Sequence, residues 1–506
     1  MIFIFLLVSV VFVSFAGAQN HSELWGPSGE KWHSASRLPD FSFAGYQKGE
    51  KALPSIKQVC KVTDFGAVPD DDKDDTKAFL KAIEQTKAGA IYIPAGKYLL
   101  SDIIWIKKPG IVLRGAGQGK TVLHFSGELQ DVLPDTGSTT SGRETSRYSW
   151  SGGFIWAQGS VKENKISDIS SDAKLGDDVI TLSSTSGIKK GQEVLIQLEE
   201  DSPKSLIQHI YSMDSGNVSK VSKTIITMNN RVIDVTANKV TLERPLRFDI
   251  KQAWKPELRS LETDVSEVGI EDLTIDFPIK PYKGHFTERG MNGIALTHVL
   301  NSWIKNVQIS NSDSGLFLTY SSFCTVSGVL LDSQRNQSGL TGHHGIKAGN
   351  DCLIEDFDIR TRFIHDLTVG KFQTGNVFKN GRALSLSVDH HKKGPFANLF
   401  TNIDAGDGTS FWRCGGGKNL GKNSAGGTTF WCIKSDRQIS PPPGTYGPVS
   451  MNLVGMNMKH GSVKEANGKW IEAIAAEKLI PADLHTAQLK RRLKLGNKAY
   501  KLKSEN

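Results

Sequence analysis

The residues that could do chemistry in this 506-residue chain gather in one region. Five of the thirteen histidines lie between positions 343 and 391, namely His343, His344, His365, His390 and His391. The stretch LSVDHHKKGP (386–395) adds Asp389 and two lysines to the last pair. Imidazole gains and loses protons near neutral pH, so such a cluster is suited to acid–base catalysis. A metal site and a solvated run of charges are alternative interpretations.

The spacing of the cluster indicates a repeating structure. His343, Asp366, Asp389 and Trp412 follow one another at intervals of 23 residues. If 23 residues make one turn, equivalent residues on successive turns lie about one strand spacing apart, roughly 4.8 Å. The spacing therefore predicts that these four residues and their neighbours stack into one patch.

Strand alternation predicts which side chains of the patch face solvent. Ile346, Val369 and Val388 are expected to face an apolar interior, because their neighbours in the repeat are apolar. Side chains alternate along a strand, which turns five polar residues outward: His343, Lys347, Asp366, Asp389 and His391. The same rule points His344, His365 and His390 inward as core histidines, unless a turn re-aims them.

The elements that carry these residues are predicted to be short parallel strands. The phrases GIEDLTI (269–275), WIKNVQI (303–309), TVSGVLL (325–331) and LIEDFDI (353–359) share one frame of apolar positions. Ile270, Ile304, Val326, Ile354, Val377 and Leu399 occupy its first apolar position. A repeat of about 20–30 residues built on short strands is typical of a solenoid. We therefore expect an all-β protein whose main β-helix covers residues 256–460.

The N-terminal part points to the same fold. VTDFGAVPDDDKDD precedes TKAFLKAIEQTK, whose apolar residues fit one face of a helix, and AIYIPAGKYLL follows. This stretch, residues 59–126, resembles the N-terminal signature of the pectate-lyase-like superfamily (pectate lyase 3 type) of right-handed parallel β-helices. The resemblance implies that the helix caps the solenoid and that the substrate is a polysaccharide. Members of the superfamily act as lyases, hydrolases or epimerases, so the resemblance supplies no catalytic residue.

The rest of the chain divides around this solenoid. Residues 1–18 form an expected signal peptide, which predicts a secreted, extracellular or periplasmic protein. Residues 19–58 are expected to wrap the solenoid or line its groove, and residues 59–162 to form its first turns. Short alternating strands such as DVITL (178–182) predict a β insert over 163–255. Residues 461–506 are expected to form a basic tail or cap.

Charge and motifs limit the partners. The formal charge of +8 favours an acidic polymer as the partner. No nucleic-acid-binding motif appears, and no stretch after the signal peptide approaches the roughly 20 apolar residues of a membrane helix. We expect a monomer that binds neither nucleic acid nor membrane.

The residue types of the patch suit β-elimination in a uronic-acid polymer. A cation neutralises the C6 carboxylate, a base removes H5, and an acid protonates the leaving oxygen. His391 or His343 is the expected base, and Asp389 or Asp366 is expected to orient a histidine. Lys347 is expected to neutralise charge. The expected substrate-binding residues are Arg413, Trp412, Arg382, Lys392 and His365.

Two alternatives to the lyase stay open, and a metal site is compatible with the lyase or the hydrolase. An inverting glycoside hydrolase would need two carboxyl groups about 6.5–9.5 Å apart, for which Asp366 and Asp389 are candidates. The same two aspartates could bind a calcium ion, which is compatible with either enzyme. A non-catalytic carbohydrate-binding or adhesin β-helix would use the groove without an acid–base cluster.

Overall fold

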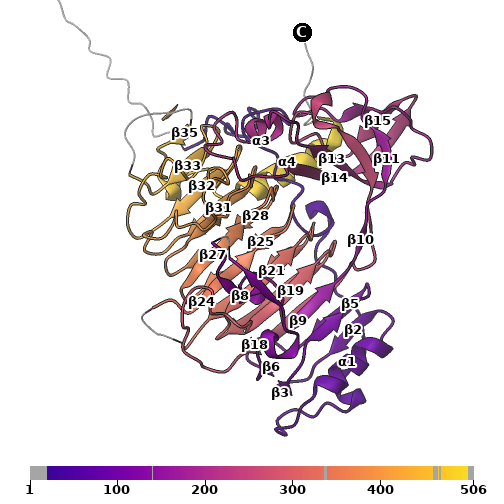
Figure 1. Ribbon diagram of the computed structural model, residues 1–506, viewed down its shortest axis with the longest axis vertical. Coiled ribbons are helices and arrows are strands. Elements are labelled where there is room, and N and C mark those ends of the chain that lie inside the picture. The colour runs from indigo at the N-terminus through magenta and orange to yellow at the C-terminus, as the bar shows by residue number, and fades with distance from the viewer. Residues whose placement is uncertain (1–19, 140, 336–338, 460–464, 467–468, 500–506) are drawn as a thin grey trace, which may run out of the picture.

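The computed structural model describes residues 20–139, 141–335, 339–459, 465–466 and 469–499 (Figure 1). The expected signal peptide, residues 1–18, lies outside them. The described chain is a right-handed parallel β-helix of three sheets, with an antiparallel insert packed beside its later turns. The helix α1 (Thr76–Gln85) covers its N-terminal end.

The first sheet is the longest of the three, and its strands pair in parallel from turn to turn. It contains β1 (Gln58–Lys61), β2 (Gly89–Tyr92), β5 (Ile111–Arg114), β18 (Gly269–Asp276), β20 (Trp303–Ser310), β22 (Thr325–Ser327), β25 (Leu353–Glu355), β28 (Val377–Lys379), β31 (Leu399–Asp404), β32 (Thr429–Lys434), β33 (Asn452–Met456) and β35 (Lys469–Glu472), with β34 (Glu465–Ala466) antiparallel to β35.

The second and third sheets complete each turn. The second sheet contains β3 (Gly96–Leu100), β6 (Thr121–Phe125), β23 (Leu330–Asp332), β26 (Asp358–Ile359) and β29 (Arg382–Ala383), together with the ends of β18, β20 and β31. The third sheet contains β4 (Ile104–Ile106), β9 (Ile155–Gln158), β19 (Asn292–Thr297), β21 (Ser314–Thr319), β24 (Gly342–Lys347), β27 (Phe363–Val369) and β30 (Val388–His390).

The core fills the interior of the three sheets, as the repeat predicted, but its register shifts in the later turns. Ile354 pairs with Phe378, and Phe378 pairs with Phe400. Val377 and Leu399, which we expected in the interior, instead pack in a second apolar cluster outside the first sheet. Both faces of this sheet are covered there, so alternation between apolar and polar residues does not distinguish them.

The outer face of the first sheet is covered by both ends of the chain. Trp32, Phe41 and Phe43 from the N-terminal segment pack there with Trp431. The helix α4 (Leu484–Ala499) lies beside them, and its Gln488 side chain donates to Pro39 O and accepts from Phe41 N. The N-terminal segment therefore wraps the first sheet and does not run along the third.

The insert has its own core and its own sheet. Its strands are β11 (Lys165–Asp168), β12 (Val179–Thr181), β13 (Glu193–Glu199), β14 (Ile225–Thr236), β15 (Lys239–Leu242) and β16 (Glu257–Ser260), joined by α3 (Ser205–Ile210) and by the pair β10 (Val161–Lys162) and β17 (Glu262–Thr263). Its last strand ends five residues beyond the expected boundary at 255. A smaller excursion over 129–146 holds α2 (Leu129–Val132), β7 (Thr136–Ser138) and β8 (Glu144–Ser146). Across the described residues no helix is long and apolar enough to cross a membrane.

Candidate functional site

The outer face of the third sheet carries the predicted patch, but in a different register. Phe317, Lys347, Thr368 and Asp389 stand side by side on successive strands. Lys347 to Thr368 and Thr368 to Asp389 are 21 residues each, so the predicted stack at 23-residue intervals is wrong. The turns differ in length, because 28 residues separate Thr325 from Leu353 on the first sheet and 22 separate Val377 from Leu399. An average period therefore does not give the register on one face.

His344 and His365 point outward, against the alternation rule. They pair with each other across β24 and β27, and His344 Nδ1 lies 3.1 Å from Thr368 Oγ1 in the outward row. The alternation is interrupted one turn earlier at Gly315. A Cβ there would meet the core side chain of Leu331, and the next residue, Leu316, also faces the core. Two successive inward positions break the alternation on β21, and the residue that precedes them, Ser314, pairs with His344 on the next strand.

His390 behaves as the rule predicted. It lies in the core, with its ring 5.5 Å from that of Phe400 and its Nδ1 2.8 Å from the hydroxyl of Tyr446. Burial lowers its pKa to about 4, although Asp389 opposes this shift. His390 is therefore a neutral core histidine and is not part of the cluster.

The remaining histidines form one continuous cluster. Ring centroids lie 4.4 Å apart for His285 and His343, 5.6 Å for His343 and His365, and 5.8 Å for His365 and His391. His343, His344 and His365 are at most 3% exposed, whereas the His391 side chain is 43% exposed and His285 is exposed. The cluster thus runs from the buried face of the sheet to solvent.

Asp389 anchors the cluster. Its carboxylate is buried, with Oδ2 2.9 Å from His391 Nδ1 and 3.6 Å from His365 Nδ1. Its Oδ1 accepts a hydrogen bond of 2.8 Å from Gly415 N. Burial alone would raise the pKa of Asp389, but the charges of His365 and His391 and these hydrogen bonds lower the pKa below its usual range. An anionic Asp389 therefore fixes the orientation of His391.

A second carboxyl group reaches the cluster from the connection between β18 and β19. Glu288 is buried, accepts hydrogen bonds from the Tyr282 hydroxyl and the Ser149 hydroxyl, and has Oε1 3.4 Å from His343 Nδ1. Burial raises its pKa. Asp313 holds the end of this connection by accepting hydrogen bonds from the backbone N–H groups of Gly290 and Met291.

Burial keeps the inner histidines neutral. It lowers the pKa of His365 to about 4, with Asp389 opposing and other nearby positive groups adding to the effect. The pKa values of His343 and His344 are lowered well below the usual value for the same first reason, and neighbouring histidines add to the effect. Near pH 7 these three rings are therefore uncharged bases.

Two basic residues stand at the edges of the cluster. Burial lowers the pKa of Lys347 to about 8. The nearby charge of Lys371 adds to this shift, and that of Asp389 opposes it. Arg413 donates from Nη2 to Phe363 O at 2.8 Å, and its charge acts on both His365 and Asp366. Lys392 follows His391 in a turn and lies against Gly416.

Three predicted site residues are engaged elsewhere. The Asp366 carboxylate accepts hydrogen bonds from Ser387 N and Ser387 Oγ, and burial raises its pKa to about 6. Trp412 packs its ring against those of Phe430 and Tyr446, and its Nε1 donates to Ser440 O. Arg382 pairs with Asp358 on the second sheet, which is a different face of the solenoid.

The possible metal ligands also differ from the predicted pair of aspartates. Asp366 and Asp389 bind different partners, which removes the basis for calcium binding by this pair, the alternative that the sequence left open. One atom each of His285, His343 and His365 lie within 4.8 Å of one another, and the same holds for His365, Asp389 and His391. Imidazole-rich sets suit transition metals, whereas calcium takes oxygen ligands.

The sequence pattern did not predict that the cluster would include His285, Tyr282 and Glu288. They lie in KPYKGHFTER (280–289), inside a connection that belongs to no strand. Nothing periodic indicates that this connection crosses to the third sheet. The histidine at position 285 was one of thirteen and stood 58 residues before the cluster that drew attention.

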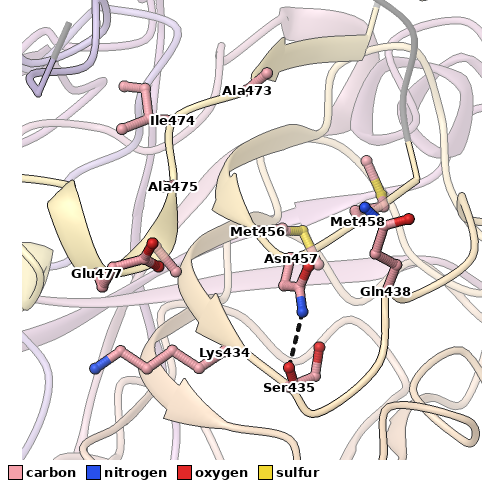
Figure 2. A pocket seen from close by; sticks show the side chains of 11 residues that line it. Lys434, Ser435, Gln438, Met456, Asn457, Met458, Ala473, Ile474, Ala475 and Glu477 are labelled. Atoms are coloured by element: carbon pink, nitrogen blue, oxygen red, sulfur yellow. Dashed lines mark hydrogen bonds between the residues drawn. The ribbon is translucent and has the colours of Figure 1, made fainter. Parts of the chain in front are cut away.

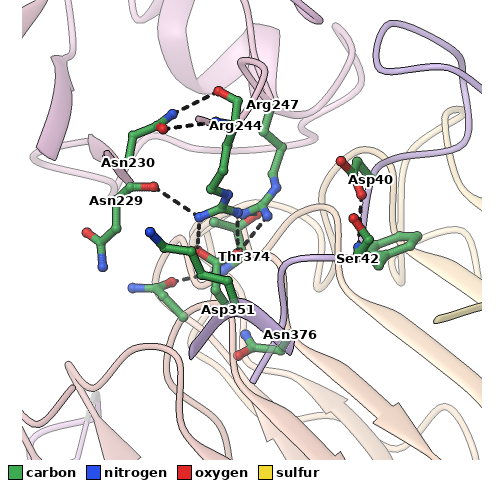
Figure 3. A network of polar contacts seen from close by, with 12 residues as sticks. Asp40, Ser42, Asn229, Asn230, Arg244, Arg247, Asp351, Thr374 and Asn376 are labelled. Carbon is green, nitrogen blue, oxygen red and sulfur yellow. Dashed lines mark hydrogen bonds and ion pairs between the residues drawn. The ribbon is translucent and has the colours of Figure 1, made fainter. Parts of the chain in front are cut away.

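Two cavities lie away from the cluster. One of about 410 Å³ is lined by Lys434, Asn457 and Glu477 near the C-terminal turns, where Asn457 Nδ2 donates to Ser435 O (Figure 2). The other, of about 380 Å³, lies between the insert and the solenoid. Beside it Asp351 binds Arg244 and Arg247 in a network of polar contacts (Figure 3). Neither lining contains a residue of the histidine cluster.

One family model matches part of the first half of the chain. Residues 59–243 match the family model for rhamnogalacturonase A/epimerase, pectate lyase-like. The chain is 38% identical over 102 residues to mannuronan C5-epimerase AlgE3 of Azotobacter vinelandii, covering 18% of this chain and 6% of that protein. It is 33% identical over 96 residues to mannuronan C5-epimerase AlgE4 of the same organism, covering 17% of each. The matches thus span less than a fifth of these two relatives.

Solved structures give similarities at low identity. The tailspike protein gp49 from Pseudomonas phage LKA1 aligns with a TM-score of 0.48 at 14% identity, covering 78% of this chain and 70% of that one. The A-module of AlgE4 from Azotobacter vinelandii aligns with a TM-score of 0.29 at 15% identity, covering 78% and 81%. The histidine cluster, which begins at His285, lies beyond the segment that the family model matches.

Proposed function

We propose that this chain, a member of the pectate-lyase-like superfamily of right-handed parallel β-helices, cleaves an acidic polysaccharide by β-elimination. The observation that carries the proposal is the pair formed by His391 and Asp389. Asp389 is buried and holds His391 Nδ1 at 2.9 Å, while the His391 side chain is 43% exposed. A histidine whose Nδ1 is bound by a carboxylate keeps Nε2 as the basic atom, which suits a general base.

The charges around this pair fit a uronic-acid residue. Lys347 stands two strands from Asp389 in the same outward row, and Arg413 lies close enough for its charge to act on His365. Cationic groups that neutralise a C6 carboxylate make the proton on C5 more acidic. A net charge of +8 favours the approach of such a polymer.

The reaction then proceeds within one sugar linkage. His391 removes the C5 proton, the electron pair forms a double bond between C5 and C4, and the bond from C4 to the glycosidic oxygen breaks. The proton held by His391 passes to that oxygen. The products are an unsaturated uronate and a new chain end, and no other reactant is required.

Epimerisation at C5 is the second candidate. The family description and the two relatives from Azotobacter vinelandii name epimerases. Epimerisation shares the first step, removal of the C5 proton, and ends with a proton returned to the opposite face of C5. The same base therefore serves both reactions, and the fate of the C4–O bond distinguishes them.

The test is turnover of a panel of polyuronates by the purified protein. We expect the absorbance of unsaturated uronate to appear with at least one polymer, and inversion at C5 measured by NMR would identify the epimerase instead. His391→Ala and Asp389→Asn should each lower kcat/KM about 100-fold or more, as loss of a general base does. New reducing ends without unsaturation would contradict the proposal and indicate a hydrolase.

Two matched variants control for general effects. Asp366→Asn changes a buried aspartate on the neighbouring strand whose partner is Ser387, so kcat/KM should change less than 10-fold. His298→Asn changes a half-buried histidine outside the cluster, at a left-handed backbone position that asparagine tolerates. Equal losses in all four variants would mean that the cluster has no special role.

A further inference from the structure

The inner histidines have ring nitrogens without partners, although they are buried. His343 Nδ1 and His365 Nδ1 are inaccessible to solvent and make no hydrogen bond to any described residue. Buried polar atoms are nearly always paired, so each exception requires a physical reason. Each of these nitrogens nevertheless faces a carboxylate: Glu288 Oε1 lies 3.4 Å from His343 Nδ1, and Asp389 Oδ2 lies 3.6 Å from His365 Nδ1.

This arrangement matches the surroundings of metal-bound histidines. A histidine that binds a metal through one nitrogen usually donates its other N–H to a carboxylate or carbonyl, which fixes the ring. Small movements of Glu288 and Asp389 would bring both distances to hydrogen-bond length. The Nε2 atoms of both rings would then be left for an ion.

We propose that His285, His343 and His365 form a binding site for one divalent transition-metal ion of the zinc class. One ligand atom of each already lies within 4.8 Å of the others. Zinc–nitrogen distances of about 2.0–2.1 Å in a tetrahedron place two nitrogens about 3.4 Å apart. The site must therefore close by at most about 1.4 Å, and His285, which lies exposed on the connection between β18 and β19, is the ligand least enclosed by the fold.

The chemistry of the ligands decides the class of ion. Three imidazoles suit zinc, copper, nickel or iron, and disfavour calcium and magnesium.

Three protein ligands leave one position of a tetrahedral ion open, as in catalytic zinc sites. The exposed side of this site is the side of His391 and His285. An ion there could accept a carboxylate of the polymer, next to the base. The site itself stands on its own geometry and does not depend on the reaction proposed above.

Direct metal binding without any polymer tests the proposal. After chelator treatment and dialysis, we expect the full chain to bind one Zn(II) in calorimetry. Cobalt(II) should give the visible absorption of a four-coordinate nitrogen site. His285→Ala, which alters an exposed residue, should weaken binding at least 10-fold, and His343→Ala at least 100-fold. Glu288→Gln should weaken binding about 10- to 100-fold, as loss of a carboxylate behind a ligand does.

Two variants give the opposite expectation. His391→Ala and His298→Asn should bind Zn(II) within about 3-fold of the unaltered chain. Absence of zinc and cobalt binding in a folded chain would overturn the proposal. So would binding that survives His285→Ala and is lost in His391→Ala, because the ion would then lie among His365, Asp389 and His391. Circular dichroism of each variant separates loss of the site from loss of the fold.

Discussion

At the scale of single residues, the hydrogen-bond and charge partners of a buried carboxyl group determine whether its pKa is raised or lowered. Asp366 and Asp389 lie on neighbouring strands and are both at most 2% exposed. Asp366 binds a neutral serine, and burial raises its pKa to about 6. Asp389 lies against two histidines and a backbone N–H, and its pKa is lowered. Of these two aspartates, Asp389 is the one whose carboxylate lies against histidine rings and can orient one of them.

Asp351 is a third buried carboxylate, and it joins the insert to the solenoid. Its Oδ1 lies 2.8 Å from Arg244 Nη2 and 2.6 Å from Arg247 Nη2, and all three side chains are at most 6% exposed (Figure 3). Burial would raise the pKa of Asp351, but the two arginines lower it. A buried, desolvated network of ion pairs thus joins the insert to the solenoid.

Asp351→Asn should destabilise the protein strongly. Removing one partner of a buried ion pair costs about 3–5 kcal/mol, because the remaining charges stay buried. Urea unfolding of the variant measures this loss. Asp168→Asn is the control, since Asp168 pairs with Lys165 at a side-chain exposure of 58% and an exposed pair contributes about 0–1 kcal/mol. Losses of equal size would contradict a docking role for Asp351.

At the scale of elements, close contact between strands of the third sheet positions the histidines. A Cβ at Gly345 would lie 2.4 Å from Asp366 O on the next strand. Any larger residue would push β24 away from β27. The contact between His344 Nδ1 and Thr368 Oγ1, and the side-by-side position of His344 and His365, depend on this approach.

Gly345→Ala should therefore damage both the fold and the site. Overpacking at such a contact costs about 1–3 kcal/mol, which thermal unfolding would detect. Zn(II) affinity should fall at least 10-fold, because His343 and His365 lie on the two strands that separate. Gly444→Ala is the control, since nothing lies within 4 Å of its Cβ position. Unchanged metal affinity in a destabilised Gly345→Ala would show that the strand contact does not set the site.

At the scale of the whole molecule, buried neutral histidines make the fold sensitive to acid. Burial lowers the pKa of His390 to about 4 and that of His485, in α4, to about 3, where Lys379 and Arg492 add to the effect and Asp483 opposes it. The ordinary pKa is about 6.5, so the unfolded chain binds more protons than the folded chain between about pH 3 and 6.5. The stability that depends on these two neutral histidines is therefore complete above about pH 6.5 and is lost progressively below it.

His485→Phe should reduce this loss. One histidine with such a shift costs about 3 kcal/mol between pH 7.5 and pH 4.5. Urea unfolding at both pH values gives the slope for the unaltered chain and for the variant. At pH 7.5 His485 is uncharged in both states, so the difference in unfolding free energy between the variant and the unaltered chain at that pH measures the change in packing alone. Parallel slopes in the two proteins would show that His485 does not contribute to the acid sensitivity.

The sequence by itself determined the solenoid and the concentration of chemistry on it. Apolar positions at short intervals, the capping helix with Phe79 on its buried face, and the outward positions of Lys347 and Asp389 follow from local periodicity. Periodicity is a property of one strand and its neighbours in the chain.

Only the tertiary structure decided which residues meet. The register between turns depends on loop lengths, so Asp389 lies beside Thr368 and not beside Asp366. His344 lies against Thr368 of the outward row, contrary to the alternation, and a connection from another sheet brought His285 and Glu288 to the cluster. These outcomes depend on contacts between turns, because the sequence of one strand does not specify which residues pack beside it on the next turn.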